Sequence, residues 1–292
     1  MDEKQLREVK LQTILQSPSY RLAYEDIAFL EDPALRPMRV QLELLKPELA
    51  FERLNINSTI VVFGSTRVVE AEAAEEQLKR AQARLAESPD DLGRRRAVAR
   101  AERIVAKARY YEEARKFAAL VSSRTQQDGT REYVIVTGGG PGIMEAANRG
   151  AADVRAKSGG LNIHLPREQF PNPYITPELC FQFRYFAMRK LHFLLRAKAL
   201  VVFPGGFGTL DELFDALTLR QTGRMQEIPV VMFGRGYWSK VLDLQFLADE
   251  GAIDDADLDL IQYAETAEDA WQRIVEFYAK TGGHNSSAIG AP

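Results

Sequence analysis

The chain has 292 residues, of which 46% are hydrophobic and 27% are charged, and its formal net charge is −3. This composition is typical of one large or two small globular domains, and it gives no general reason to expect binding to nucleic acid or to a membrane. The single cysteine, Cys180, excludes an intramolecular disulfide and suits a reducing compartment. The N-terminal residues contain no apolar signal core, and no run of about 18 apolar residues follows, so we expect a cytoplasmic protein.

The chain begins with a helical arm. Residues 1–50 place Leu and Glu at helical intervals, and Pro33, Pro37 and Pro47 are expected to divide them into short helices. We assign residues 1–57 to this N-terminal arm.

The first buried strand is predicted at residues 60–63, which read Ile-Val-Val-Phe. It ends in Gly-Ser-Thr-Arg at 64–67, a turn rich in hydrogen-bond donors. Ser65 and Thr66 fit two interpretations, plain turn chemistry or contact with a ligand at the carboxyl end of a parallel strand, and the sequence leaves both open.

Residues 68–109 differ in composition from their surroundings. They are rich in Ala, Glu and Arg, and they predict two helices broken near residues 88–93, the first acidic and the second basic. A basic helix can bind nucleic acid. The nearly complementary charges, and the absence of aromatic residues among the arginines, favour instead a hairpin whose arms face each other, or an oligomer contact. A further amphipathic helix is predicted at 110–123.

A second strand, predicted at 133–136, runs into Thr-Gly-Gly-Gly-Pro-Gly-Ile-Met-Glu at 137–145. This is a strand, a glycine loop and the start of a helix, but the loop does not fit the dinucleotide fingerprint G-x-G-x-x-G. The next strand, at 161–165, does not end in the acidic residue that would bind an NAD ribose. We therefore expect a loop that binds a mononucleotide or a phosphate, and not a dehydrogenase.

A helix is predicted at 183–197, on which Arg189, His192 and Arg196 share one face. Strand 201–203 follows, and then comes the glycine-rich stretch at 204–209.

This stretch, Pro-Gly-Gly-Phe-Gly-Thr, again joins a strand to a helix. Glycines let the backbone approach a ligand closely, and the free N–H groups at the start of a helix attract an anion, to which Thr209 adds a hydroxyl. Glu212 is expected in the first turn of the helix. Because a carboxylate beside a bound phosphate repels it, we assign Glu212 to the uncharged part of the ligand.

Strand 229–233 and a final helix at 271–278 complete the alternation of strands and helices. The pattern predicts an α/β fold: a Rossmann-like, doubly wound parallel sheet in a single domain, with the N-terminal helical arm and an inserted helical hairpin. Neither a metal nor an organic cofactor is expected. The three histidines lack ligand spacing, and no lysine follows a cofactor-phosphate loop in the way that pyridoxal phosphate requires.

Together these motifs resemble those of the LOG (Lonely guy) family, whose members are often labelled lysine decarboxylase-like. The matching segments are P-G-G-x-G-T-x-x-E at 204–212, a G-G-G-x-x-G-like loop at 137–147, a G-S-S/T turn at 64–66, and Arg189-Lys190 at the end of an M-H-x-R-K helix motif. Phe186-Ala187 replace Met-His of that motif, at a position associated with the base pocket, which leaves the base preference open.

The resemblance covers roughly residues 58–280, which we assign to one LOG-type nucleotide-binding catalytic domain. Residues 68–109 stand out as its helical insertion. Residues 281–292, rich in Gly, Ser and Asn, are assigned to a disordered tail.

The resemblance implies a phosphoribohydrolase. Such an enzyme cleaves the N-glycosidic bond of a nucleoside 5′-monophosphate, AMP or a cytokinin riboside 5′-monophosphate, to a free base and ribose 5-phosphate. It implies a homodimer or a higher homo-oligomer, with the Arg189 helix near the interface, and catalytic roles for Arg189 and Glu212. The residues implied to bind phosphate or nucleotide are Gly205, Gly206, Gly208, Thr209, Gly139, Gly140, Ser65 and Lys190.

The expected chemistry agrees with the residue types. Cleavage of the bond between C1′ and the base develops oxocarbenium charge on the ribose, which a nearby carboxylate stabilises. A non-catalytic nucleotide-binding or carrier protein on the same fold is the alternative; it would keep the glycine loops and would not need Glu212.

Overall fold

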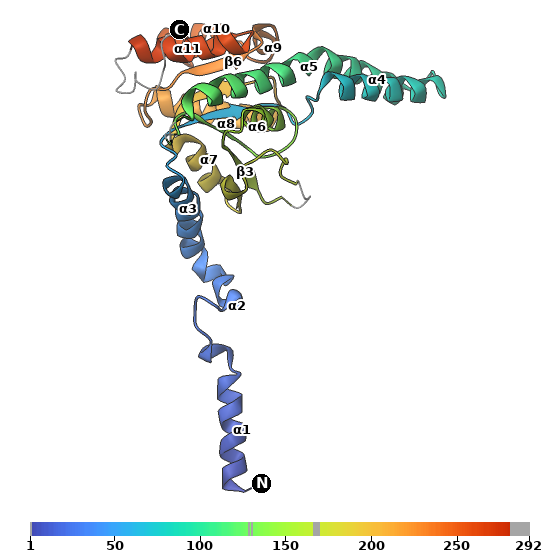
Figure 1. The fold of residues 1–292 in the computed structure, drawn as a ribbon. Helices are drawn as coiled ribbons and strands as arrows, with labels where there is room; N and C mark the ends of the chain where they lie inside the picture. Colours follow the sequence, from blue (N-terminus) through green and yellow to red (C-terminus); the bar gives the residue numbers. More distant parts are fainter. Residues whose placement is uncertain (1, 128, 130, 166–169, 281–292) are drawn as a thin grey trace. The chain divides into compact units, whose positions relative to one another are not determined.

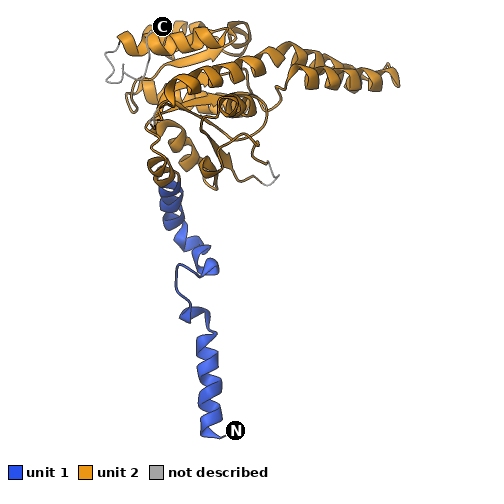
Figure 2. Cartoon of the chain, viewed as in Figure 1, with its two compact units in different colours: residues 1–46 blue, residues 47–292 orange. Residues whose placement is uncertain are grey.

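The structure is a computed structural model of the chain, and it describes residues 2–127, 129, 131–165 and 170–280. The predicted tail at 281–292 lies outside these residues. The chain divides into two compact units, residues 1–46 and 47–292 (Figure 2). Residues 47–57, which the sequence assigns to the arm, belong to the second unit.

The first unit is made of short helical segments. Its elements are α1 (Glu3–Leu15), η1 (Pro18–Tyr20), α2 (Ile27–Leu30), η2 (Pro33–Leu35) and the first part of α3 (Arg36–Arg53). The prediction that Pro37 and Pro47 divide the helices is wrong. Pro37 is the second residue of α3, where a missing N–H costs nothing, and Pro47 lies inside α3, which loses one backbone hydrogen bond there and continues.

The second unit is built on a seven-stranded parallel sheet with the order β4-β3-β2-β1-β5-β6-β7. The strands are β1 (Thr59–Phe63), β2 (Val134–Thr137), β3 (Ser158–Ile163), β4 (Cys180–Phe183), β5 (Ala197–Val202), β6 (Val230–Phe233) and β7 (Ile261–Ala264). This arrangement confirms the predicted doubly wound parallel sheet.

The two edge strands, β4 and β7, were not predicted. Each has four residues, and each buries only two of them, so neither shows the continuous apolar run that marks a central parallel strand. Phe183, expected to begin a helix, instead ends β4; the helix begins at Phe186.

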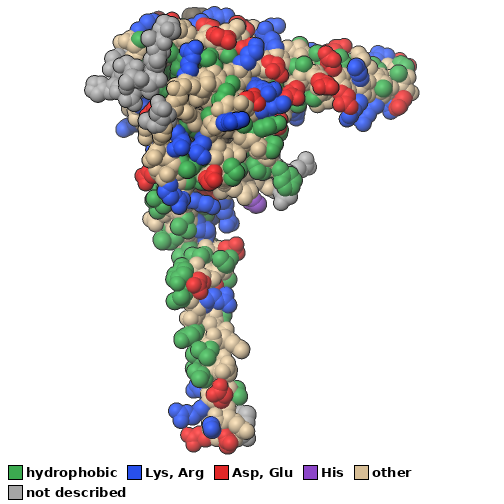
Figure 3. All heavy atoms as spheres, in the orientation of Figure 1, with side chains coloured by type: hydrophobic (Ala, Val, Ile, Leu, Met, Phe, Trp, Pro, Cys, Tyr) green, Lys and Arg blue, Asp and Glu red, His purple; other side chains and the backbone are tan. Residues whose placement is uncertain are grey.

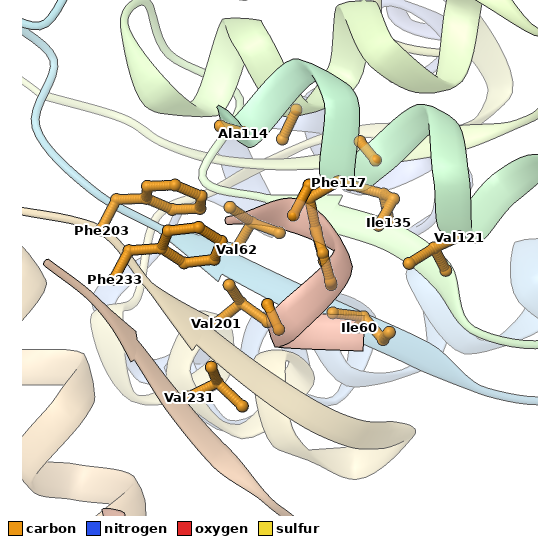
Figure 4. Packing of buried hydrophobic residues seen from close by; sticks show 14 of the residues in the cluster. Ile60, Val62, Ala114, Phe117, Val121, Ile135, Val201, Phe203, Val231 and Phe233 are labelled. Carbon is orange, nitrogen blue, oxygen red and sulfur yellow. The ribbon is translucent and has the colours of Figure 1, made fainter. Parts of the chain in front are cut away.

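Helices cover both faces of the sheet. They are α4 (Ala71–Ala86), α5 (Leu92–Thr125), α6 (Ile143–Asp153), α7 (Phe186–Leu195), α8 (Phe207–Gln221), α9 (Arg235–Val241), α10 (Leu244–Asp249) and α11 (Ala267–Lys280), with the short turns η3 (Pro177–Leu179) and η4 (Asp255–Leu260). Alternate strand residues point to opposite faces. Val62 and Phe203 pack with residues of α5 (Figure 4) and with residues of α6 and α11, whereas Val61 and Val202 pack with residues of α7, α8 and α9.

Helix α5 is one continuous helix of 34 residues. Its second half packs into the core through Ala114, Phe117 and Val121 (Figure 4), and its first half pairs with α4 as a hairpin (Figure 1). The predicted break near residues 88–93 is where α4 ends and α5 begins. The predicted separate helix at 110–123 is the second half of α5.

The site lies where the strand order of the sheet changes direction, between β1 and β5. From β1 the chain adds β2, β3 and β4 on one side, and it then returns to place β5 on the other side of β1. The segments that follow β1 and β5 are therefore neighbours: the Phe203 N–H donates to the Phe63 carbonyl (2.8 Å) and the Ser65 N–H to the Pro204 carbonyl (3.1 Å). Ligands of doubly wound sheets bind at this point, outside the carboxyl ends of the strands.

Within the described ranges, no helix has both the length and the apolar character needed to cross a bilayer.

Candidate functional site

A cavity of about 760 Å³ lies at the carboxyl ends of β1 and β5. Its wall is formed by the turn after β1, the loop between β5 and α8, and parts of α5, α7 and α8. Seven of the predicted site residues line it: Ser65, Arg189, Gly205, Gly206, Gly208, Thr209 and Glu212. Of the remaining three, Gly139 and Gly140 lie in the loop between β2 and α6, and the ammonium group of Lys190 lies 3.5 Å from the Glu212 carboxylate.

The β5–α8 loop (residues 203–206, with the first residues of α8) presents open backbone to the cavity. Gly206 and Gly208 are exposed, and a Cβ atom added to either would meet no other atom within 4 Å. Gly205 differs, because a Cβ there would overlap the Thr209 side chain. The Tyr237 hydroxyl fixes the loop by donating to the Gly205 carbonyl (2.7 Å). The loop thus leaves space at a helix N-terminus, where an anion is favoured.

The β2–α6 loop (residues 138–142) is filled by the protein's own side chains. A Cβ atom at Gly138 would lie 2.6 Å from Nη2 of Arg189, and one at Gly139, whose φ is +76°, would overlap the Asn162 amide. The Asn172 amide donates to the Gly139 carbonyl (3.2 Å) and to the Gly140 carbonyl (3.1 Å). A contact between phosphate and these two glycines stays a prediction.

Ser65 connects the two glycine loops through its backbone. Its N–H donates to the Pro204 carbonyl, and its carbonyl accepts from the Ile143 N–H (3.1 Å each). Its hydroxyl accepts from the Arg67 N–H (3.1 Å), which is turn chemistry. Ser65 also lines the cavity, and its second interpretation, as a ligand contact, stays a prediction.

Glu212 is a buried carboxylate, 7% exposed, on the cavity wall. It lies in the second turn of α8, and not in the first as expected, because the helix begins at Phe207, two residues before Thr209. The Lys190 ammonium group lies 3.5 Å from Glu212 Oε2, 2.9 Å from Asp211 Oδ2 and 3.3 Å from Asp215 Oδ2. Lys190 therefore holds one face of α8 against α7.

Arg189 lies beside Glu212 on the same wall. Its Nε donates to the Leu161 carbonyl (2.7 Å), and its guanidinium carbon lies 5.1 Å from the centre of the Phe193 ring. The Arg189 side chain is therefore held by contacts with β3 and α7, and its guanidinium packs close to Gly138 of the β2–α6 loop.

Burial and charge act in opposite directions on these groups. Burial raises the pKa of Glu212, and the charges of Lys190 and Arg189 offset part of that rise. Burial lowers the pKa of Arg189, with partial compensation from Glu212. For Lys190, burial lowers the pKa, but the hydrogen bond to Asp211 and the neighbouring carboxylates raise it overall. A carboxyl group with a raised pKa in a cavity is a frequent feature of catalytic sites.

Several lining residues were not predicted as site residues. Tyr237 lines the cavity and supports the β5–α8 loop. Phe186 lines it with 51% of its surface exposed, at the motif position that the resemblance associates with the base pocket. Cations of the predicted hairpin, Arg100, Arg103 and Lys107, also line it. Their spacing of three and four residues places them on one face of a helix, and the sequence shows this spacing. The neighbouring residues do not indicate which part of the protein that face contacts.

In the part of the chain that the structure describes, no group of three or more His, Cys, Asp and Glu residues is arranged to hold a metal ion.

Comparison with known proteins identifies relatives of the segment that carries the site. A family model described as possible lysine decarboxylase matches residues 144–274. The chain is 28% identical over 156 residues to cytokinin riboside 5′-monophosphate phosphoribohydrolase LOG3 of Arabidopsis thaliana, covering 51% of this chain and 69% of that protein. It is 30% identical over 118 residues to the pyrimidine/purine nucleotide 5′-monophosphate nucleosidase of Escherichia coli K12, covering 37% of this chain and only 26% of that enzyme.

Among solved structures, the molybdenum cofactor carrier protein of Chlamydomonas reinhardtii is 18% identical, with a TM-score of 0.45 over 76% of this chain and 99% of that one.

Proposed function

This chain belongs to the LOG/lysine decarboxylase-like family, and from that premise we propose that it hydrolyses the N-glycosidic bond of a nucleoside 5′-monophosphate. The products would be a free base and ribose 5-phosphate. The observation that carries the proposal is a buried carboxylate, Glu212, on the cavity wall one turn beyond an open glycine loop. AMP and cytokinin riboside 5′-monophosphates are the first substrates to test.

The 5′-phosphate would bind over Gly206 and Gly208, with the Thr209 hydroxyl as a further donor. Free N–H groups at the start of α8 supply the positive end of a helix dipole there. The rise of a helix is about 1.5 Å per residue, so Glu212 lies about one ribose beyond the phosphate. Binding energy from the phosphate would fix the sugar with its anomeric carbon near this carboxylate.

In the reaction, the bond between C1′ and the base nitrogen breaks and its electron pair leaves with the base. Water adds to C1′, and the departing base gains a proton. The Glu212 carboxylate would stabilise the positive charge on the ribose and orient the water. Arg189, held by the Leu161 carbonyl, would offset the negative charge on the phosphate or on the departing base. Lys190 would act as a positioning residue for Glu212.

Two aromatic side chains offer surfaces for the base. Phe186 and Phe207 both line the cavity and are 51% and 92% exposed. A base stacked on such a ring gains about 1–3 kcal/mol and is bound with little selection for its identity. Phe186 occupies the position at which the chain departs from the family motif, so it is the residue that we expect to influence base preference.

We further propose a homodimer, as the family resemblance implies. Light scattering at the concentration used for the assays tests this directly, and a monomeric mass would contradict it.

The function is tested by incubating the protein with AMP, GMP, CMP, UMP and a cytokinin riboside 5′-monophosphate, followed by chromatography of free base and an assay for ribose 5-phosphate. We expect both products in equal amounts from at least one nucleotide, and none from the matching nucleoside, which lacks the phosphate. Binding of these nucleotides without release of base would support the carrier alternative and contradict the hydrolase.

A further inference from the structure

One side of the cavity is strongly basic. We define the cationic wall as Arg67, after β1, together with Arg100, Arg103 and Lys107 of α5; all four line the cavity. With Arg189 the described lining residues include five cations and a single carboxylate, that of Glu212. The protein as a whole has a net charge of −3, so positive charge is concentrated here against the overall balance.

The wall differs from the rest of the hairpin in its ion pairs. Near the tip, where acidic and basic side chains are mixed (Figure 3), Arg94 pairs with Glu87 at 3.0 Å and Arg95 with Asp90 at 2.9 Å. Among the described residues, none of the three arginines of the wall makes an ion pair with a carboxylate. Lys107 lies over the Tyr237 ring, 5.1 Å from its centre. Glu87 and Asp90 belong to the segment that connects α4 to α5, and within the described part of the chain no ion pair joins α4 to α5. The predicted hairpin is therefore confirmed, but the predicted pairing of its acidic and basic arms is not found.

The wall begins beside the β5–α8 loop and leads away from it. Lys107 contacts Tyr237, whose hydroxyl bonds to Gly205, and Arg103 and Arg100 follow at successive turns of α5. With a rise of about 1.5 Å per residue, Arg100 and Lys107 are about 10 Å apart along the helix. This row of charges is longer than one phosphate needs. It matches a short chain of phosphates that starts at the glycine loop.

We propose that the cationic wall is a subsite for the β- and γ-phosphates of a nucleoside 5′-diphosphate or 5′-triphosphate. The α-phosphate of this ligand lies on the β5–α8 loop, where the proposed function places the phosphate of a monophosphate; the inference rests on that placement. Such a nucleotide competes with the monophosphate for the cavity. Bidentate contacts between guanidinium and phosphate suit arginine at the two outer positions.

The test is the binding of AMP, ADP and ATP, measured by calorimetry at low and at moderate salt without divalent metal. For the unmodified chain we expect ATP to bind at least about tenfold more tightly than AMP, with ADP between them. The advantage of ATP is expected to shrink as salt is raised, because exposed charges are screened. An ATP affinity no greater than that of AMP would overturn the proposal.

Variants of α5 locate the effect. In Arg100→Ala/Arg103→Ala we expect the ratio of the AMP and ATP dissociation constants to fall to within about twofold of one. In Arg100→Lys/Arg103→Lys, which keeps both charges and loses the bidentate contacts, we expect a ratio between those of the alanine variant and the unmodified chain. Arg96→Ala removes one charge from an exposed position of the same helix that does not line the cavity, and it should keep the full ratio. A double alanine variant that melts normally and keeps the ratio would contradict the subsite.

Two further ligands distinguish this proposal from two alternatives, a second phosphate bound elsewhere and a site for nucleic acid. Adenosine 3′,5′-bisphosphate carries its second phosphate elsewhere, and we expect it to bind less tightly than ADP; equal affinity would contradict a phosphate chain on the wall. A 5′-phosphorylated single-stranded oligonucleotide that binds as tightly as ATP, and loses affinity in the same double variant, would assign the wall to nucleic acid instead.

The outcome is independent of turnover. If no monophosphate is hydrolysed but the ATP preference depends on Arg100 and Arg103, the proposed function fails and the subsite stands. If AMP is hydrolysed and ATP binds no more tightly than AMP, the proposed function stands and the subsite fails.

Discussion

The two glycine loops of this protein look alike in sequence and do different things in the structure. Each joins a parallel strand to a helix, and each is followed by a glutamate in that helix, Glu212 or Glu145. At the β5–α8 loop, Gly206 and Gly208 leave open space above their backbone. At the β2–α6 loop, the space beside Gly138 and Gly139 is occupied by side chains of the protein itself.

The comparison shows that a glycine lets another group come close to the backbone, and that this group can be either a ligand or a side chain of the protein itself. In the β5–α8 loop the open space is available to a ligand. In the β2–α6 loop the approaching groups are Arg189 and Asn162, so those glycines support the site from below. We therefore expect substitutions in the first loop to affect binding and catalysis, and substitutions in the second to affect stability or the placement of Arg189.

The largest effect is expected from Glu212→Gln, paired with Glu145→Gln as a control. Glu145 also follows a glycine loop, but its carboxylate accepts a hydrogen bond from the Tyr111 hydroxyl (3.0 Å) and does not line the cavity. Loss of the charge at Glu212 should lower kcat about 10³-fold, within the range for a residue that acts on the transition state. The control should retain activity near that of the unmodified chain. Similar losses in both variants would contradict the contrast between the loops.

The next largest effects are expected when a glycine of each loop is replaced by alanine. Gly208→Ala should fold normally, since nothing lies within 4 Å of the new Cβ, yet it should raise KM roughly tenfold to a hundredfold by filling the proposed phosphate position. Gly139→Ala should instead lower the free energy of unfolding by about 2 kcal/mol, because of its positive φ and the overlap with Asn162. Steady-state kinetics and chemical denaturation of both variants measure this. A normal KM for a folded Gly208→Ala protein would place the phosphate elsewhere.

A smaller effect is expected from Gly138→Ala. The new Cβ would lie 2.6 Å from Nη2 of Arg189 and 2.9 Å from Sδ of Met144, so the guanidinium must shift while the backbone, which has no positive φ at this residue, is unstrained. We expect kcat to fall about tenfold, equivalent to about 1.4 kcal/mol of transition-state stabilisation, with a smaller change in KM. An unchanged kcat in the folded variant would argue against a catalytic role for Arg189.

The smallest effect concerns pH. Because burial raises the pKa of Glu212 above that of the unfolded chain, its ionised form destabilises the fold, and this destabilisation disappears as the pH falls through the raised pKa. Glu212→Gln should therefore melt at a higher temperature than the unmodified chain at pH 8, and this difference should disappear as the pH falls below about 4. Lys190 keeps Asp211 and Asp215 as partners in this variant.

Thermal melts of both proteins across this range provide the measurement. A difference in melting temperature that does not change with pH would contradict the assignment. The same raised pKa predicts that kcat/KM of the unmodified chain declines as the pH is lowered, beginning above the ordinary glutamate range near pH 4.3.

The parts of the molecule that the sequence predicts correctly are those with local signals. The central strands are short apolar runs, and the residues of the β5–α8 loop, from Gly205 to Glu212, are contiguous or one helical turn apart. Their presence on one cavity wall follows from the strand-loop-helix unit itself. Arg189 joins them because it lies near the start of α7, which follows β4, so that this end of the helix and the loop after β5 both lie at the carboxyl ends of the parallel strands.

The parts that sequence reasoning missed depend on contacts between distant segments. Arg100 and Glu212 are 112 positions apart, and only the path of α5 across the sheet brings both to one cavity. The edge strands β4 and β7 carry weak patterns because water reaches part of each strand. The roles of Gly138 and Gly139 depend on which side chains fill the space beside them, which a glycine motif does not encode.

Helix α5 is stiff along its whole length, since it continues without a break from the hairpin into the core. Phe117 and Val121 fix one end, so the backbone that carries Arg100 and Arg103 is already in place before any ligand arrives. Little ordering of the main chain is then needed on binding, which leaves more of the electrostatic attraction as affinity. The same stiffness means that a force bending the hairpin would displace the charges of the cationic wall.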